Sequence, residues 1–146
     1  IMMAQIRNKK AFFDYEILDR VTAGISLLGP EVKSLRAGRG SLVGAFISVR
    51  DGQAHIKNFH IPKWEFSQEN IEPLRDRKLL LRKREILRLQ KKLDEKGYTI
   101  VPLSVFFKNG FAKVEIALGK GKKQYDKRAT IKKRDEERRI AGKLKK

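Results

Sequence analysis

The chain has 146 residues, and its 35 Lys and Arg against 17 Asp and Glu give a formal net charge of +18. It contains no Cys, which excludes disulfides and thiolate metal sites, and no apolar run approaches the roughly 20 residues of a membrane-spanning helix. Such a positive charge favours nucleic acid over a membrane surface or a small acidic molecule, and we expect one compact cytoplasmic domain with a terminal arm.

The N-terminal part is predicted to begin with β-structure. Apolar residues alternate with others from Ala11 to Leu18, which is the two-residue period of a half-buried strand, and residues 8–10 would open that strand. Residues 22–24 (Thr-Ala-Gly) are predicted to break it, and a short alternating run restarts at Ile25.

A short helix of one or two turns is predicted at residues 31–36, with Gly29-Pro30 at its start. Pro30 suits the first helical position, because the backbone donor that proline lacks has no partner there. Val32 and Leu35 are three residues apart and should face the interior. The charged side chains of this helix are expected to stay outside: Glu31, Lys33 and Arg36.

The middle of the chain reads as a β-hairpin followed by an irregular loop. Val43–Arg50 and Gln53–Asn58 flank Asp51-Gly52, a dipeptide that favours the positive φ angles of a tight turn. The loop from Phe59 to Asn70 contains an isolated Trp64. That side chain either packs on the body of the protein or stacks on a nucleic-acid base.

Asp76–Lys96 is predicted to be one long helix, because its Leu and Ile residues recur at three-, four- and seven-residue spacings. Asp76 and Gly97 suit its two ends. Eight cations occupy the remaining face: Arg77, Lys78, Arg82, Lys83, Arg84, Arg88, Lys91 and Lys92. This face is either simply solvated or lies along phosphates.

A second hairpin is predicted around Asn109-Gly110, between Tyr98–Lys108 and Phe111–Leu118. Four apolar residues of its first strand are expected on one face: Val101, Leu103, Val105 and Phe107. Pro102 cannot donate to a ladder of hydrogen bonds and should lie at an edge or a bulge.

Together these elements predict a mainly β fold with helices (α+β). Roughly six strands joined by tight turns tend to close into a small barrel, and an oligonucleotide-binding-like antiparallel barrel with a short and a long helix is the natural candidate. We assign residues 1–119 to this barrel, whose open face and loops commonly hold nucleic acid in other proteins of this shape, and residues 120–146 to a basic C-terminal tail.

The tail carries half of the excess charge. Residues 120–146 contain thirteen Lys or Arg and four Asp or Glu, with few large apolar side chains. Such a segment should be disordered when free and could form a helix when bound to a polyphosphate. Tyr125 lies within this run of cations, where it could stack on a base. The alternative is a solubility tail that has no target.

Several motifs resemble those of the SsrA-binding proteins (small protein B, SmpB). Glu-Val-Lys-Ser-Leu-Arg at 31–36 and Gly-Lys-Lys-x-x-Asp-Lys-Arg at 121–128 are long and specific. The segments that carry the resemblance are, in chain order, residues 8–11 with Tyr15, 23–25, 31–38, 77–81 with Glu85 and Ile86, 101–103 and 119–128. The chain departs from the family's commoner residues at Tyr125 (often His) and at Pro30 (often Thr).

The resemblance implies an RNA-binding adaptor of trans-translation, the bacterial rescue of ribosomes stalled on messages without a stop codon. The barrel would bind the tRNA-like domain of tmRNA. It would deliver that RNA, as alanyl-tmRNA with elongation factor Tu, to the 30S subunit of the 70S ribosome. The tail would fold as a helix in the empty mRNA channel, near the decoding centre. The resemblance implies no enzyme activity, catalytic residue, metal or cofactor, and we expect a monomer with no membrane partner.

The resemblance also implies two sets of site residues. The set facing tmRNA is Asn8, Lys9, Glu31, Lys33, Arg36, Arg77 and Lys78. The set facing the decoding centre and mRNA channel is Lys122, Lys123, Tyr125, Asp126, Lys127, Arg128, Lys132, Lys133 and Arg134. Glu31 would accept hydrogen bonds from RNA, orient Lys33 and Arg36, or only favour its helix N-terminus.

Two other functional classes remain open on the sequence. A structural protein of the ribosome or nucleoid would coat phosphate without preferring one RNA. A nuclease would need a metal site, but Asp14, Glu16 and Asp19 form no recognisable motif. His55 and His60 lack a zinc-type pattern and are expected to be structural or surface histidines.

Overall fold

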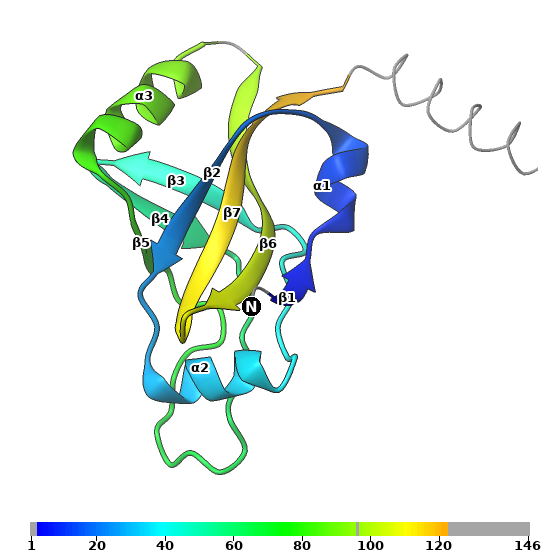
Figure 1. Cartoon of the computed structure of the whole chain (residues 1–146), viewed down its shortest axis with the longest axis vertical. Helices are drawn as coiled ribbons and strands as arrows, with labels where there is room; N and C mark the ends of the chain where they lie inside the picture. The colour runs from blue at the N-terminus through cyan, green and yellow to red at the C-terminus, as the bar shows by residue number, and fades with distance from the viewer. Residues whose placement is uncertain (1–2, 96, 123–146) are drawn as a thin grey trace, which may run out of the picture.

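The structure, a computed structural model, describes residues 3–95 and 97–122. These residues form seven strands and three helices (Figure 1). In chain order the elements are β1 (Met3–Arg7), α1 (Lys9–Asp14), β2 (Tyr15–Ile25), α2 (Gly29–Arg36), β3 (Phe46–Arg50), β4 (Gln53–Lys57), β5 (Arg77–Leu80), α3 (Lys83–Leu93), β6 (Tyr98–Lys108) and β7 (Phe111–Gly121).

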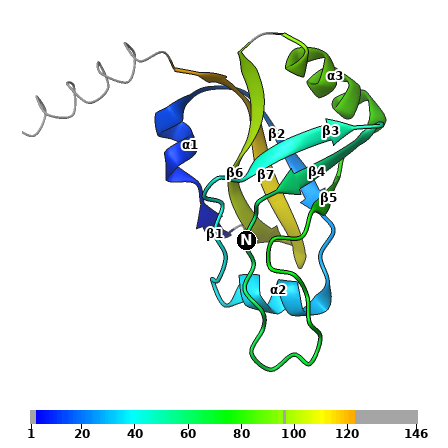
Figure 2. The same ribbon diagram turned by 180° about the vertical axis from the view of Figure 1, so that it is seen from behind.

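All seven strands belong to one antiparallel sheet in the order β1-β6-β7-β2-β5-β4-β3. The mainly β fold with helices is therefore confirmed. The sheet curls until β3 lies against β6 (Figure 2), but among the described residues these two strands do not pair. The free edge of β6 along residues 104–107 pairs with β1 and is not available to β3. The sheet is therefore not closed by hydrogen bonds, and the expectation of a closed barrel is corrected.

The N-terminal prediction was wrong in two places. Residues 9–14 form a helix, because Asn8 caps it: Asn8 Oδ1 accepts from the Ala11 backbone N at 3.3 Å. A strand, β1, precedes this helix. Residues 22–24 do not break β2, since Ala23 and Gly24 pair with β7 and Gly24 also pairs with β5. Partners on both sides override the weak strand preference of these small residues.

Both predicted hairpin turns are confirmed. Asp51 and Gly52 have φ angles of 53° and 73°, and Asn109 and Gly110 have 52° and 81°. These positive values are the ones that Asx-Gly turns supply to a two-residue hairpin. The short helix predicted at residues 31–36 is confirmed as well; α2 begins at Gly29 and has Pro30 in its first turn.

The prediction of one helix over residues 76–96 was wrong at its start. Arg77–Leu80 form β5 between β2 and β4, with Arg77 and Leu79 buried and Lys78 and Leu80 exposed. The helix α3 begins only at Lys83. At its start, Glu85 Oε1 accepts a hydrogen bond from the backbone N of Arg82, the N-cap residue, at 2.9 Å. Arg77 and Lys78 therefore do not belong to the cationic helix face.

A bulge in β6 divides the apolar residues between two sides of the sheet. The register with β7 shifts between Pro102 and Ser104, which confirms the predicted place of the proline beside a bulge. Val105 and Phe107 face the main core, whereas Val101 and Leu103 pack under α1 with Ala11 and Ala117. The expectation of one shared face for the four residues of β6 was wrong for this reason.

Within the described part of the chain, no helix has the length and hydropathy that crossing a bilayer requires.

Candidate nucleic-acid interface

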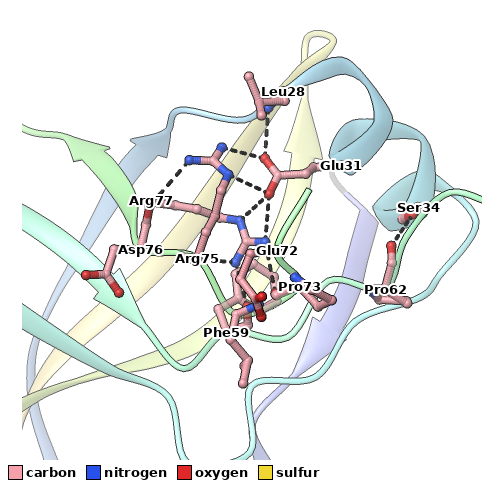
Figure 3. Close-up of polar contacts among 11 residues, drawn as sticks. Leu28, Glu31, Ser34, Phe59, Pro62, Glu72, Pro73, Arg75, Asp76 and Arg77 are labelled. Carbon is pink, nitrogen blue, oxygen red and sulfur yellow. Dashed lines mark hydrogen bonds and ion pairs between the residues drawn. The ribbon is translucent and has the colours of Figure 1, made fainter. Parts of the chain in front are cut away.

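Glu31 lies at the centre of a buried ion-pair network (Figure 3). Its side chain is only 3% exposed, at the place where the Ser34 hydroxyl of α2 donates to the Pro62 carbonyl of the loop between β4 and β5. Oε1 accepts from the Leu28 backbone N at 2.9 Å and from Arg75 Nη2 at 2.6 Å. Oε2 accepts from Arg75 Nε at 2.9 Å and from Arg77 Nε at 2.7 Å. Both carboxylate oxygens are thus fully engaged inside the protein.

Arg77 extends this network to the backbone. Its side chain has no exposed area, and its Nη1 donates to the Phe59 carbonyl at 2.6 Å. Its Nη2 donates to the Pro73 carbonyl at 3.1 Å. The guanidinium therefore fastens together the two ends of the loop of residues 58–76, which contains no regular strand or helix.

The charge states follow from these contacts. Burial on its own raises the pKa of Glu31, but hydrogen bonds from Arg75, Leu28 and Arg77 outweigh it and hold that pKa below its ordinary value. Burial lowers the pKa of Arg77, against the opposing effect of Glu31. Arginine stays protonated in either case, so the network is a carboxylate held between two guanidinium groups.

Three of the residues predicted to face RNA lie inside the fold instead. Glu31 was expected to stay outside its helix and is buried, Arg77 is buried in β5, and Asn8 is 8% exposed. Asn8 caps α1, and its Nδ2 donates to the Pro102 carbonyl at 2.9 Å. The physical reason is the same for all three, since each satisfies backbone or charged groups that burial would otherwise leave unpaired.

Lys33 and Arg36 are exposed on α2, as predicted, and Arg36 reaches the β6–β7 turn. The Arg36 guanidinium lies 4.6 Å from the centre of the Phe107 ring, and its Nη2 donates to the Gly110 carbonyl at 3.3 Å. Phe111 follows that turn and is 69% exposed. This is an aromatic ring next to cations, an arrangement suited to a stacked base.

The same side of the sheet continues from Phe111 across β7, β2 and β5. Lys113 lies two residues after Phe111 and pairs with Gly24, which in turn pairs with Leu80. A Cβ built on Gly24 would lie 3.2 Å from Leu80 Cδ1, so the exposed leucine lies directly over the glycine. Lys78 is exposed on β5, two residues before Leu80.

We name this surface the outer cationic face. It comprises Lys33, Arg36, Lys78, Leu80, Phe111 and Lys113. Sequence reasoning missed Leu80, Phe111 and Lys113. The residue types of β5 (Arg-Lys-Leu-Leu) carry no alternation of polar and apolar side chains that could have revealed Leu80.

Two other predicted residues lie elsewhere. Lys9 is exposed on α1, away from the outer cationic face, and Lys122 lies at the opposite end of α1. The Lys122 backbone N donates to the Asp14 carbonyl at 3.1 Å, so the root of the tail is tied to α1. The remaining residues of the tail set, from Lys123 to Arg134, lie outside the described residues.

Within residues 3–95 and 97–122, no three or more His, Asp or Glu side chains gather where they could hold a metal ion. His55 is half-buried on β4. His60 is exposed, and its backbone forms an isolated antiparallel bridge with Ser41.

The chain was compared with known proteins. The model of the SmpB protein family matches residues 5–146. The SsrA-binding protein of Acidothermus cellulolyticus is 56% identical over 138 residues, which are 94% of this chain and 87% of the relative. The SsrA-binding protein of Pelobacter propionicus is 51% identical over 139 residues, 94% of this chain and 91% of the relative.

A solved structure agrees with these relatives. It is called "tmRNA-SmpB: a journey to the center of the bacterial ribosome", and it matches with a TM-score of 0.70 and 46% identity. The match covers 82% of this chain and 85% of the other. Since the family model spans nearly the whole sequence and the relatives match at about half of their positions, the chain belongs to the SmpB family of SsrA-binding proteins.

Proposed function

We propose that this chain is an RNA-binding adaptor that binds the tRNA-like domain of tmRNA and delivers it to stalled ribosomes in trans-translation. It would work with elongation factor Tu on alanyl-tmRNA, as a cytoplasmic monomer without a catalytic site of its own. Support comes from relatives named for binding SsrA and from the likeness to a structure named for tmRNA, SmpB and the ribosome.

The single observation that carries the proposal is the outer cationic face. Four cations surround two apolar side chains that are exposed to solvent, Leu80 at 57% and Phe111 at 69%. Cations alone would suit any phosphate, but exposed apolar groups between them can also pack on unstacked bases of a folded RNA. This combination favours an RNA with splayed bases over a uniform duplex.

Within this proposal, the buried residues of the predicted set act by positioning. Glu31 and Arg77 fix α2 against β5, and these two elements carry Lys33, Arg36 and Lys78 of the outer cationic face. Asn8 fixes the start of α1 in the same way. Lys9 would contact the RNA from a separate position on α1.

The tail would have a separate role in the empty mRNA channel. The residues proposed for it are Lys122, Lys123, Tyr125, Asp126, Lys127, Arg128, Lys132, Lys133 and Arg134. The bond from Lys122 to the Asp14 carbonyl supports this division, because it fixes the point at which the tail leaves the sheet.

Competition binding tests the proposal. Labelled tRNA-like domain of tmRNA is bound to the full chain and displaced by unlabelled tRNA-like domain, bulk tRNA or duplex DNA at one salt concentration. An adaptor should release the label much more readily to the matching RNA than to bulk tRNA or DNA. Equal displacement by all three would instead identify a protein that only coats phosphate.

A further inference from the structure

The loop of residues 58–76 projects beyond α2 (Figures 1 and 2), and Phe66 lies near the middle of this loop in the sequence. Phe66 is 76% exposed, more than any other large apolar side chain in the described residues. Its ring meets the edge of Trp64, with ring centres 5.4 Å apart and an angle of 66° between the planes. A single exposed apolar side chain is ordinary on a protein surface, so a role for Phe66 depends on how the loop holds it and on the charges around it.

The loop is held firmly at its base, so Phe66 is presented from a defined position. Arg77 bonds the carbonyls of Phe59 and Pro73 at the two ends of the loop. The Ser34 hydroxyl of α2 donates to the Pro62 carbonyl at 2.7 Å (Figure 3). Trp64 is half-buried and lines a small pocket together with Pro30, Pro62 and Ile71. Such preorganisation lowers the entropy cost of binding a partner.

The charge around this part of the loop is opposite to that of the whole protein. Residues 62–74 carry one Lys and three exposed Glu (Glu65, Glu69 and Glu72), a net charge of −2 in a chain of +18. The exposed Phe111 has Lys108, Lys113 and Arg36 around it instead. The two exposed phenylalanines therefore have opposite electrostatic surroundings, and those of Phe66 suit RNA less well than those of Phe111.

We propose that the middle of this loop docks on a protein surface in which Lys and Arg side chains surround an apolar pocket that accepts Phe66. The three glutamates complement such a surface, and complementary charge orients an approaching partner. This inference rests on the proposed function, because we expect the basic partner to be a protein of the ribosome. RNA would bind the outer cationic face, which includes Phe111.

Site-directed cross-linking separates the two surfaces. A photoreactive phenylalanine analogue is placed at position 66, or at position 111 as a matched control, in the full chain. Each protein is irradiated with purified bacterial 70S ribosomes and tmRNA. Position 66 should give an adduct that withstands ribonuclease and contains a Lys- and Arg-rich peptide of a second protein. Position 111 should give an adduct that ribonuclease removes.

An RNA adduct at position 66 would overturn the inference, and so would no adduct there while position 111 cross-links. If neither position cross-links and the chain does not sediment with ribosomes, the proposed function itself fails, and this inference fails with it.

Substitutions provide a second readout. Phe66→Ala should weaken ribosome binding about tenfold while leaving the affinity for isolated tmRNA unchanged, as expected for a buried aromatic anchor. Phe111→Ala should weaken binding of isolated tmRNA.

The sign of a charge effect gives a further test. Glu65→Lys should weaken ribosome binding by about fivefold or less, even though it makes the chain more attractive to RNA. Glu95→Lys changes the charge equally at an exposed site just after α3 and should not weaken binding. If Glu65→Lys strengthens binding as much as Glu95→Lys, the loop faces RNA and the inference is wrong.

Discussion

Arg77 Nε donates to Glu31 Oε2 at 2.7 Å in the interior, between side chains that are 0% and 3% exposed. The two residues are 46 positions apart in the chain. Their contact joins α2, the loop of residues 58–76 and β5, which carry the proposed loop surface and the part of the outer cationic face that does not lie on β7. Both surfaces therefore depend on a charge pair that neither partner is expected to touch.

Glu31→Ala should destabilise the fold strongly. Removing one partner of a buried ion pair costs about 3–5 kcal/mol, because the remaining charge stays buried without compensation. Urea unfolding measures this change. Glu115→Ala is the control, since Glu115 pairs with the exposed Arg20 at 3.6 Å and its loss should cost less than about 1 kcal/mol. Equal losses for the two variants would show that the buried pair does not hold the fold.

The contribution of Glu31 to stability should vanish in acid. Because its folded pKa lies below the value of about 4.3 in an unfolded chain, the stabilisation is present above that pH. It is lost as the pH falls through the folded pKa. The difference in unfolding free energy between the wild type and Glu31→Gln should therefore be largest near neutral pH and shrink below about pH 4. A difference that stays constant with pH would contradict this assignment.

Lys113→Gln should reduce the salt dependence of tmRNA binding. A lost phosphate contact lowers the slope of log affinity against log salt by about 0.7 to 0.9. The slope is measured from titrations at several salt concentrations.

Lys91→Gln is the informative comparison, because Lys91 is exposed on α3, whose cationic face is either solvated or bound to phosphate. An unchanged slope for Lys91→Gln means that this face is solvated. An unchanged slope for Lys113→Gln would remove β7 from the interface.

A chain that ends at Lys122 should bind tmRNA with unchanged affinity and fail to support trans-translation on stalled ribosomes. The structure sets this end point, because β7 extends to Gly121 and the Lys122 backbone N still bonds the Asp14 carbonyl. Gel-shift titration measures tmRNA binding, and an in vitro trans-translation reaction measures rescue. Loss of both activities in the shortened chain would disprove the division of roles between the folded sheet and the tail.

The features that the sequence predicted correctly are set by a few neighbouring residues. Asp51-Gly52 and Asn109-Gly110 form hairpin turns because their own backbones tolerate positive φ, whatever surrounds them. Pro30 starts α2 for an equally local reason. The family could also be predicted, because long motifs such as residues 31–36 lie intact in the chain.

The predictions that failed concern residues whose state depends on distant partners. Residues 77–80 have a helix-like pattern. They form a strand because their backbone pairs with β2 on one side and with β4 on the other. That strand buries Arg77, and only the folded chain brings Glu31 to it. The sequence alone thus determined the turns, the charge and the family of this protein. The tertiary structure decided which charged residues are buried and which face solvent, because burial depends on contacts between segments that the chain order keeps apart.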